Sequence, residues 1–367
     1  MTAPDPAGPA LTAAECDAMV DRWLATDLDT WTRDVVRRHF DPATGSPYWV
    51  RAAQALPFDP RDITRYDQLA ELGPTDLDLL RHNDPADFVP LAVPRPLAGR
   101  VWDSGGTTGS PCRVFYTPDM IAHRGVWRRW SFVTEGFEPH RRWLQATPTG
   151  PHLIGNGAWE VSGLHGGVAY TIDMDPRWVK LLIGTGRLAE AADYTDHLLN
   201  QILDVLGGGR IDYLNTTPAL LKAMLRRDPE AVARLRGVRL SGTQLSPALY
   251  RRFVAALDGG VCGLSYGNTF GNAAGLPVER GGDLMPYTPN YPQVTMAVVD
   301  RADGRTVVPL GAIGRVRLTV LHRDLFLPNV LERDEAIRHR PATGFPADGV
   351  ANVRPLAAVG TGVEGLY

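Results

Sequence analysis

The sequence predicts an α/β fold in which helices flank a sheet and a smaller β-rich part lies toward the C-terminal end. Short β-branched or aromatic runs, such as 114–117 and 213–217, alternate with helical stretches, such as 118–135 and 190–206. From about residue 290 the runs VTMAVVD and GRVRLTVL follow one another with an Asp-Gly pair between them. This second pattern is typical of antiparallel strands joined by a tight turn.

The N-terminal segment predicts a helical collar. Thr12 and Glu15 fit a capping box at the start of a first helix. Further helices are predicted over 31–40, 47–55 and 75–82, because the segments DPATG and LGP divide this region.

Three parts are expected along the chain. Residues 1–290 are predicted to form the α/β core with its helical collar. Residues 291–340 are predicted to form the β-rich subdomain, and residues 341–367 the remnant of a hinge or tail.

Composition excludes several classes of function. The 367 residues carry a formal net charge of −3 without a dense basic run, so we expect neither nucleic acid nor a membrane as partner. The three cysteines lie far apart, which argues against a disulfide framework or a zinc site and favours a cytoplasmic protein. The only lysines are Lys180 and Lys222. Lys180 lies in DPRWVKLLI, which predicts an amphipathic helix whose lysine extends to solvent, and the alternative is that Lys180 reaches a nucleotide; Lys222 is expected at the surface.

The stretch WDSGGTTGSPCRVFY, residues 102–116, concentrates glycines and hydroxyl groups between two apolar runs. Such a loop can direct backbone N–H groups and hydroxyls at a phosphate chain. It lacks the GK[ST] ending of a Walker A loop. A glycine-rich hairpin turn is the alternative for an isolated match.

The stretch is not isolated, because SGGTTGSP resembles the phosphate loop of the adenylate-forming superfamily, which contains acyl-CoA synthetases and adenylation domains. The resemblance implies the large N-terminal domain of that fold and ATP as the nucleotide. It also implies phosphate contacts from Ser104, Gly106, Thr107, Thr108 and Gly109. Gly105 and Cys112 depart from the usual form of the loop.

Three further segments resemble motifs of the same superfamily in the same order. VRLSGTQLSP is similar to a turn that lies along adenine, which implies contacts from Gly242 and Thr243. SYGNTFGNAAG is similar to the YGxTE motif, which implies that Tyr266 and Gly267 contact adenine and that Thr269 acts as a catalytic residue at the α-phosphate. In LPNVLERDEA, Asp334 takes the place of an aspartate whose carboxylate accepts both ribose hydroxyls.

Residues 46–84 also resemble phenylacetate-CoA ligases, and the length resembles that of the shortened adenylation-like proteins of phenazine-antibiotic biosynthesis. This resemblance implies an aromatic carboxylic acid as substrate and residues 151–170 as the lining of its pocket, with Trp159, Gly163 and His165 as contacts. An equally weighted alternative places this segment as a helix packed on the sheet, with Trp159 in the core.

The sequence departs from the superfamily pattern at two places. Phe270 stands where a glutamate holds Mg²⁺, and a phenyl ring cannot ligate this cation, so Mg²⁺ binding is doubtful and no metal ligand is predicted. Only residues 355–367 follow ADGVANVR, so the mobile C-terminal subdomain with its lysine is expected to be absent.

Two functions are therefore predicted. The first is ATP-dependent activation of an aromatic carboxylic acid as its acyl-adenylate in antibiotic-type secondary metabolism. The acyl group would then pass to a free nucleophile or to a partner reductase, acyltransferase or carrier protein. The second is a catalytically degenerate fold that binds an aryl acid or acyl conjugate without ATP turnover.

Overall fold

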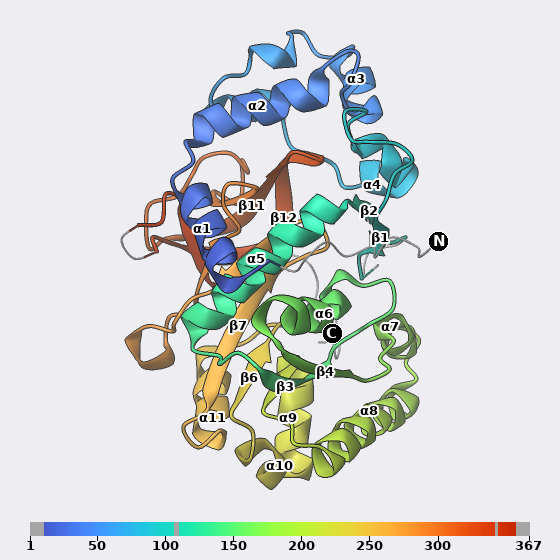
Figure 1. Cartoon of the computed structure of the whole chain (residues 1–367), viewed down its shortest axis with the longest axis vertical. Helices are drawn as coiled ribbons and strands as arrows, with labels where there is room; N and C mark the ends of the chain where they lie inside the picture. The colour runs from blue at the N-terminus through green and yellow to red at the C-terminus, as the bar shows by residue number, and fades with distance from the viewer. Residues whose placement is uncertain (1–10, 106–109, 342–343, 357–367) are drawn as a thin grey trace.

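The computed structural model describes residues 11–105, 110–341 and 344–356 (Figure 1). Its strands form a two-stranded hairpin, β1-β2, and an eleven-stranded sheet with the order β10-β11-β12-β13-β9-β8-β7-β6-β5-β3-β4. The strands are β1 (Arg100–Asp103), β2 (Arg113–Tyr116), β3 (Arg141–Ala146), β4 (Gly167–Thr171), β5 (Tyr213–Thr216), β6 (Gly237–Leu240), β7 (Val261–Gly267), β8 (Asn272–Gly275), β9 (Pro286–Pro289), β10 (Val294–Val299), β11 (Ile313–His322), β12 (Leu325–His339) and β13 (Gly349–Pro355).

The large sheet has a parallel half and an antiparallel half. Strands β4, β3, β5, β6 and β7 pair in parallel. From β7 onward every pair, through β8, β9, β13, β12, β11 and β10, is antiparallel. Because ligands of parallel sheets bind beyond the carboxyl ends of the strands, the loops that follow β6 and β7 are the expected location of a site.

Helices cover the sheet and build the collar. They are α1 (Ala13–Leu24), α2 (Leu28–Phe40), α3 (Pro47–Ala53), α4 (Leu79–His82), α5 (Pro118–Glu135), α6 (Gly157–Glu160), α7 (Pro176–Gly184), α8 (Leu188–Gly208), α9 (Pro218–Arg227), α10 (Pro229–Ala233) and α11 (Pro247–Ala256). In Figure 1, α5 crosses the middle of the molecule, with α2 and α3 above it and α8, α9 and α10 around the parallel strands below.

A short local sequence signal starts several of these helices. Thr117, Thr217 and Ser246 each cap a helix with the side-chain oxygen, and a proline follows each of them at the first helical position. The hydroxyl accepts a hydrogen bond from a backbone N–H that the helix leaves unpaired, and proline needs no such partner. Chain direction therefore changes directly after β2 and β5, which fixes where α5 and α9 lie.

The collar packs on the β11-β12 hairpin. The indole N–H of Trp31 donates to Leu321 O (2.8 Å), and that of Trp49 donates to Phe326 O (3.0 Å). Together with Phe40 these side chains belong to a core separate from the main one, which spans both halves of the large sheet. The helical collar thus covers the antiparallel half.

Most predicted elements are confirmed, with one correction. The capping box of Thr12 and Glu15 is present, and helices begin or end near the predicted bounds in the collar. The helix predicted over 75–82 is wrong in its first half, because Thr75 N donates to Asn329 O (3.4 Å) and the segment follows β12 instead.

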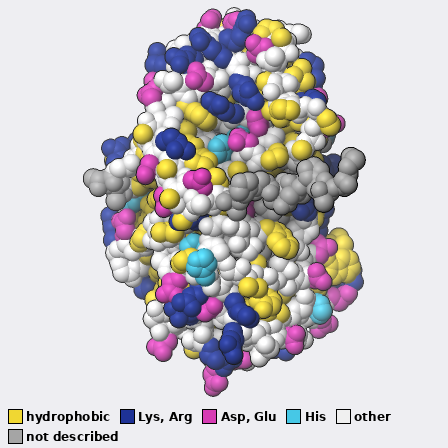
Figure 2. All heavy atoms as spheres, in the orientation of Figure 1, with side chains coloured by type: hydrophobic (Ala, Val, Ile, Leu, Met, Phe, Trp, Pro, Cys, Tyr) yellow, Lys and Arg dark blue, Asp and Glu magenta, His cyan; other side chains and the backbone are white. Residues whose placement is uncertain are grey.

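The predicted division at residue 290 stays a prediction, although the sheet runs through it, because β9 and β10 belong to the same sheet. The predicted hinge remnant contains β13, which pairs with β12 and β9. No helix among the described residues is both long and apolar enough to cross a membrane. On the face shown in Figure 2, basic and acidic side chains are interspersed.

Candidate nucleotide and acyl site

One cavity of about 660 Å³ opens at the carboxyl ends of β6 and β7. The hairpin β1-β2, helices α5 and α7, and strands β8 and β12 contribute its other walls. It brings together segments that are distant in the sequence, among them 103–105, 239–242, 265–270 and 331–333.

The predicted phosphate loop is closed at its base. Ser104 N donates to Cys112 O (2.9 Å), and Cys112 N donates to Ser104 Oγ (2.8 Å). Ser104 and Gly105 line the cavity. Gly106, Thr107, Thr108 and Gly109 lie outside the described residues, so their predicted phosphate contacts stay predictions.

The loop that follows β7 holds Thr269 beside this hairpin. Asn268 Oδ1 accepts hydrogen bonds from Phe270 N and Gly271 N, both 2.9 Å, which closes a tight turn. Thr269 Oγ1 donates to Asp103 O (3.5 Å), and Thr269 O accepts from Tyr116 Oη (2.9 Å). The predicted catalytic residue therefore contacts the two strands, β1 and β2, that flank the predicted phosphate loop.

Two of the predicted adenine and ribose residues, Tyr266 and Asp334, are hydrogen-bonded to each other. Tyr266 Oη donates to Asp334 Oδ2 (2.9 Å). Burial raises the pKa of Asp334, and the Tyr266 hydrogen bond opposes this rise. Tyr266, Gly267 and Gly242 line the cavity, whereas Asp334 and Thr243 are not among the lining residues.

Lys180 lies at the cavity, and the prediction that it extends to solvent is wrong. Its Nζ donates to Gly105 O (3.3 Å), at the start of the predicted phosphate loop. Burial, with Arg333 and Arg177 nearby, lowers the pKa of Lys180. The position follows from an ion pair between Arg177 and Asp103, which ties the first turn of α7 to β1.

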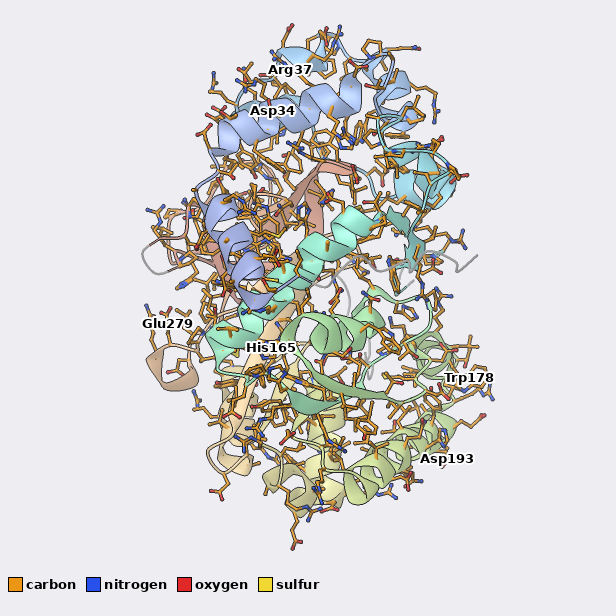
Figure 3. All side chains as sticks on the ribbon, viewed as in Figure 1. Asp34, Arg37, His165, Trp178, Asp193 and Glu279 are labelled. Carbon is orange, nitrogen blue, oxygen red and sulfur yellow. The ribbon has the colours of Figure 1, made fainter. Side chains whose placement is uncertain are left out.

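Helix α7 is amphipathic, as predicted, but its hydrophobic pattern does not show which side of the helix faces the cavity. Val179 and Leu182 are buried, whereas Trp178 projects outward at the edge of the molecule (Figure 3). Lys180 lies between the two faces. The sequence contains no sign of the ion pair between Arg177 and Asp103, which holds this side of α7 beside the hairpin.

One face of α5 forms another wall that the sequence prediction missed. Arg124, Trp127, Arg128 and Ser131 follow helical spacing and all line the cavity. Arg239 reaches the cavity from β6. The sequence of α5 contains no motif that marks these residues as a cavity wall.

Comparison with solved structures identifies the fold. The chain matches 2-hydroxyisobutyryl-CoA ligase in complex with 2-HIB-AMP and CoA in the thioesterification state with a TM-score of 0.64 and 15% identity, over 95% of this chain and 70% of that chain. An open conformation of the same ligase with 2-HIB-AMP and CoA matches with a TM-score of 0.61 and 15% identity, over 95% and 78% of the chains. No protein-family model and no curated protein matches the sequence.

The chain has the fold of the adenylate-forming ligases. The predicted fold class is thereby confirmed for the large N-terminal domain. At 15% identity the similarity shows the fold alone, so the narrower resemblance to phenylacetate-CoA ligases and to the phenazine-related proteins stays a prediction.

Of the segment 151–170 predicted to line the acid pocket, His152, Leu153 and Ile154 line the cavity, whereas Trp159, Gly163 and His165 do not. Trp159 is 70% exposed, so its alternative placement in the core is wrong as well. His165 is buried, but its Nε2 lies 3.0 Å from Phe137 O, in the interior beside α5 (Figure 3). Gly163 is exposed, and a Cβ there would meet no other atom within 4 Å. The cause is a short helix followed by a π-turn, whose inward face presents Glu160 instead.

The cavity does not present a carboxylate set suited to Mg²⁺. Phe270 is buried in its wall. Glu332 lines the cavity and accepts a hydrogen bond from Asn268 Nδ2 (2.6 Å), but burial and the nearby Asp334 raise the pKa of Glu332 to about 8. Asp103 is paired with Arg177 and Arg113, and the third lining carboxylate, Asp76, is exposed and accepts from Asp78 N (2.9 Å). The described lining residues therefore do not fit a protein-held Mg²⁺, and no step is derived through the ion.

A cluster of Asp119, His123 and His322 places three possible ligand atoms within 4.8 Å of one another. His322 Nδ1 accepts a hydrogen bond from Asp324 N (3.0 Å), so the proton of the neutral ring is on Nε2. That nitrogen lies 2.6 Å from His123 Nδ1 and donates to it. Since Nε2 then has no lone pair for a cation, the hydrogen bonding of this cluster opposes metal binding.

Proposed function

We propose that the protein uses ATP to convert a carboxylic acid into its acyl-adenylate. One observation carries the proposal: Ser104 and Gly105 of the predicted phosphate loop line a single cavity together with Thr269 and Tyr266, and Tyr266 donates to Asp334 beside that cavity. A nucleotide seated there would meet the hairpin with its phosphates and the Tyr266–Asp334 pair with its sugar and base.

In the proposed reaction a carboxylate oxygen of the acid attacks the α-phosphorus of ATP. A carboxylate–phosphorus bond forms, the bond between the α-phosphorus and the bridging oxygen breaks, and pyrophosphate leaves with that oxygen. Negative charge on the phosphoryl oxygens grows in the transition state, so preorganised donors and cations lower the barrier.

Lys180 and Thr269 are the residues placed to act on that charge. Lys180 Nζ is already at the loop, 3.3 Å from Gly105 O, and the Thr269 hydroxyl is beside Asp103 at its start. A bound phosphate would favour the ammonium form that burial disfavours. Under this proposal Lys180 stabilises the negative charge on the α-phosphoryl oxygens, and Thr269 orients the α-phosphate by a hydrogen bond from its hydroxyl.

The finer parts of the prediction rest on the sequence resemblance alone. These are an aromatic acid, antibiotic-type secondary metabolism, and acyl transfer to a free nucleophile or to a partner reductase, acyltransferase or carrier protein. We retain them as proposals.

The second candidate function is acid binding without ATP turnover. It is favoured by Phe270 and by the raised pKa of Glu332, which together leave this wall without an ionised carboxylate for a cation at neutral pH. Binding of an acid without any affinity for ATP would support it.

ATP–pyrophosphate exchange with a panel of carboxylic acids, combined with calorimetry of ATP binding, separates the two functions. Acid-dependent exchange that is lost in Asp334→Ala and partly retained in Asp334→Asn supports adenylation, since asparagine can still accept from Tyr266. Heat from acid binding with none from ATP overturns it.

A further inference from the structure

The wall that α5 contributes to the cavity has an unusual excess of positive charge. Arg124 and Arg128 of α5 line the cavity here together with Arg239 of the neighbouring β6, and their side chains are only 7%, 11% and 3% exposed. Buried guanidinium groups require opposite charge and hydrogen-bond acceptors nearby. The carboxylates and other acceptors near each arginine therefore decide whether its charge is compensated within the protein.

Arg239 is fully compensated. Its Nε donates to Glu135 Oε2 (3.0 Å), and its Nη2 donates to Ser131 Oγ (2.9 Å). Glu135 is equally buried and also accepts from Leu264 N (2.5 Å). This pair is balanced, one positive charge against one negative charge, and needs no ligand.

Arg124 and Arg128 share a single carboxylate. Arg124 Nη1 pairs with Glu160 Oε1, and Arg128 Nε lies 2.8 Å from Glu160 Oε2. Asn156 Nδ2 also donates to Glu160 Oε1 (3.1 Å). No other ion pair of these two arginines occurs among the described residues, so one positive charge at this wall lacks a counter-charge there. Burial and the neighbouring Arg124 lower the pKa of Arg128 to about 9, which leaves it charged at neutral pH.

The same wall carries buried donors without acceptors. Within the described part of the chain, Arg124 Nε, Arg128 Nη1, Trp127 Nε1 and Ser241 Oγ have no hydrogen-bond partner, and all four residues line the cavity. Native proteins pair nearly all buried donors with protein, water or ligand. A set of unpaired donors beside an uncompensated guanidinium is the complement of a carboxylate, which accepts from an arginine through two oxygens.

We infer that the acid activated at this site carries a second carboxylate, which Arg128 and Arg124 bind, so that the substrate class is dicarboxylic acids. The inference rests on the proposed adenylation. One carboxylate of the substrate attacks ATP beside Thr269 and Lys180, and the other fixes the orientation of the molecule at α5. An aromatic skeleton between the two carboxylates fits this class as well as an aliphatic one.

The test uses matched pairs of acids that differ only in the second carboxylate: benzoate with isophthalate and terephthalate, and hexanoate with adipate. In ATP–pyrophosphate exchange with the wild-type protein, we expect kcat/KM for the preferred diacid to exceed that of its monoacid by about 100-fold, because the monoacid leaves buried donors at this wall without a partner. This comparison needs no variant. Equal or faster turnover of the monoacids overturns the inference.

Arg128→Met provides the matching variant. It removes the surplus charge and leaves Arg124 paired with Glu160, and thermal unfolding reports whether it folds. We expect the diacid preference to fall by about 100-fold, because kcat/KM for the diacid falls toward that for the monoacid. The exposed Arg234→Met is the control. If Arg128→Met slows both acids equally and raises the KM for ATP, the arginines bind the triphosphate, and the inference is wrong.

Calorimetry without nucleotide separates this inference from the adenylation proposal. Diacid binding that Arg128→Met weakens, in a protein that shows no exchange with any acid, supports the second-carboxylate site and overturns adenylation. Exchange with monoacids alone supports adenylation and overturns the second-carboxylate site.

Discussion

The two ends of the cavity are built in different ways. At the proposed nucleotide end, short contiguous stretches contribute most of the contacts: β1 and β2 pair as a hairpin, and 265–270 forms a turn that holds Tyr266 and Thr269. At the proposed acyl end, the charged side chains come singly from α5, β6 and α6, and no sequence motif marks them. The comparison shows that a site formed by the backbone of one contiguous segment leaves a local sequence pattern. A site formed by side chains from several separate elements does not.

The largest effect is expected at the acyl end. Glu160→Gln removes the carboxylate that Arg124 and Arg128 share and leaves these two buried guanidinium groups without an ion pair among the described residues. We expect the free energy of unfolding to fall by about 3–5 kcal/mol, as for other broken buried ion pairs. Denaturant unfolding measures this loss, and Arg128→Met, which keeps a balanced pair, is the control with a much smaller loss. Equal stability of Glu160→Gln and wild type would mean that this charge cluster is hydrated rather than buried.

At the nucleotide end, Lys180→Met is expected to reduce the rate of pyrophosphate exchange by two to three decades, which corresponds to about 3–4 kcal/mol of transition-state stabilisation. Lys180→Arg keeps the charge and should retain part of the rate. Acid binding by calorimetry should be unchanged in both variants. A loss of acid affinity that parallels the loss of rate would place Lys180 at the acyl end and remove the distinction between the two ends.

Asp334→Ala is expected to weaken ATP binding by about 1.5–3 kcal/mol, the usual effect of losing a hydrogen bond to a charged group. The measurement is calorimetric titration with ATP and with AMP. Tyr266→Phe removes the hydrogen bond to Asp334 without removing the carboxylate, and a smaller loss is expected. If the two variants lose equal affinity, Asp334 acts through Tyr266 and not on the nucleotide.

Glu332 should give the stability a pH dependence. Its pKa rises from 4.5 to about 8 on folding, so the folded state binds the proton more tightly than the unfolded state. Its contribution to stability is fully present below pH 4.5 and is lost as the pH rises toward 8. Melting temperatures at pH 5.5 and 8.5 should therefore differ more in wild type than in Glu332→Gln. A larger difference in the variant would contradict the burial of this carboxyl group.

The smallest effect is expected for Trp159→Ala. The side chain is 70% exposed and does not line the cavity, so the free energy of unfolding should change by less than about 0.5 kcal/mol and the KM for the acid should not change. Kinetics with the preferred acid check this. A rise in KM would restore the sequence-based assignment of Trp159 to the acid pocket.

The sequence predicted much of the fold because its signals are local. Capping residues followed by proline mark the starts of α5 and α9, and alternating runs mark the strands that these helices connect. The glycine-rich hairpin and the YGNT turn were found for the same reason. Arg128 was missed and the favoured placement of Lys180 was wrong, since an amphipathic pattern gives the face of a helix but not the element that this face meets.

By itself, the sequence determined most of the elements, the order of the segments that resemble nucleotide motifs, and Phe270 at the position where that resemblance expects a glutamate. Only the tertiary structure decided that Lys180 lies at the start of the predicted phosphate loop and that Trp159 is exposed. It also decided that Arg124 and Arg128 share the carboxylate of Glu160. Local conformation depends on neighbouring residues, which the sequence displays directly. The balance of charge in a cavity depends on groups that are distant along the chain and become neighbours only when the sheet and helices pack.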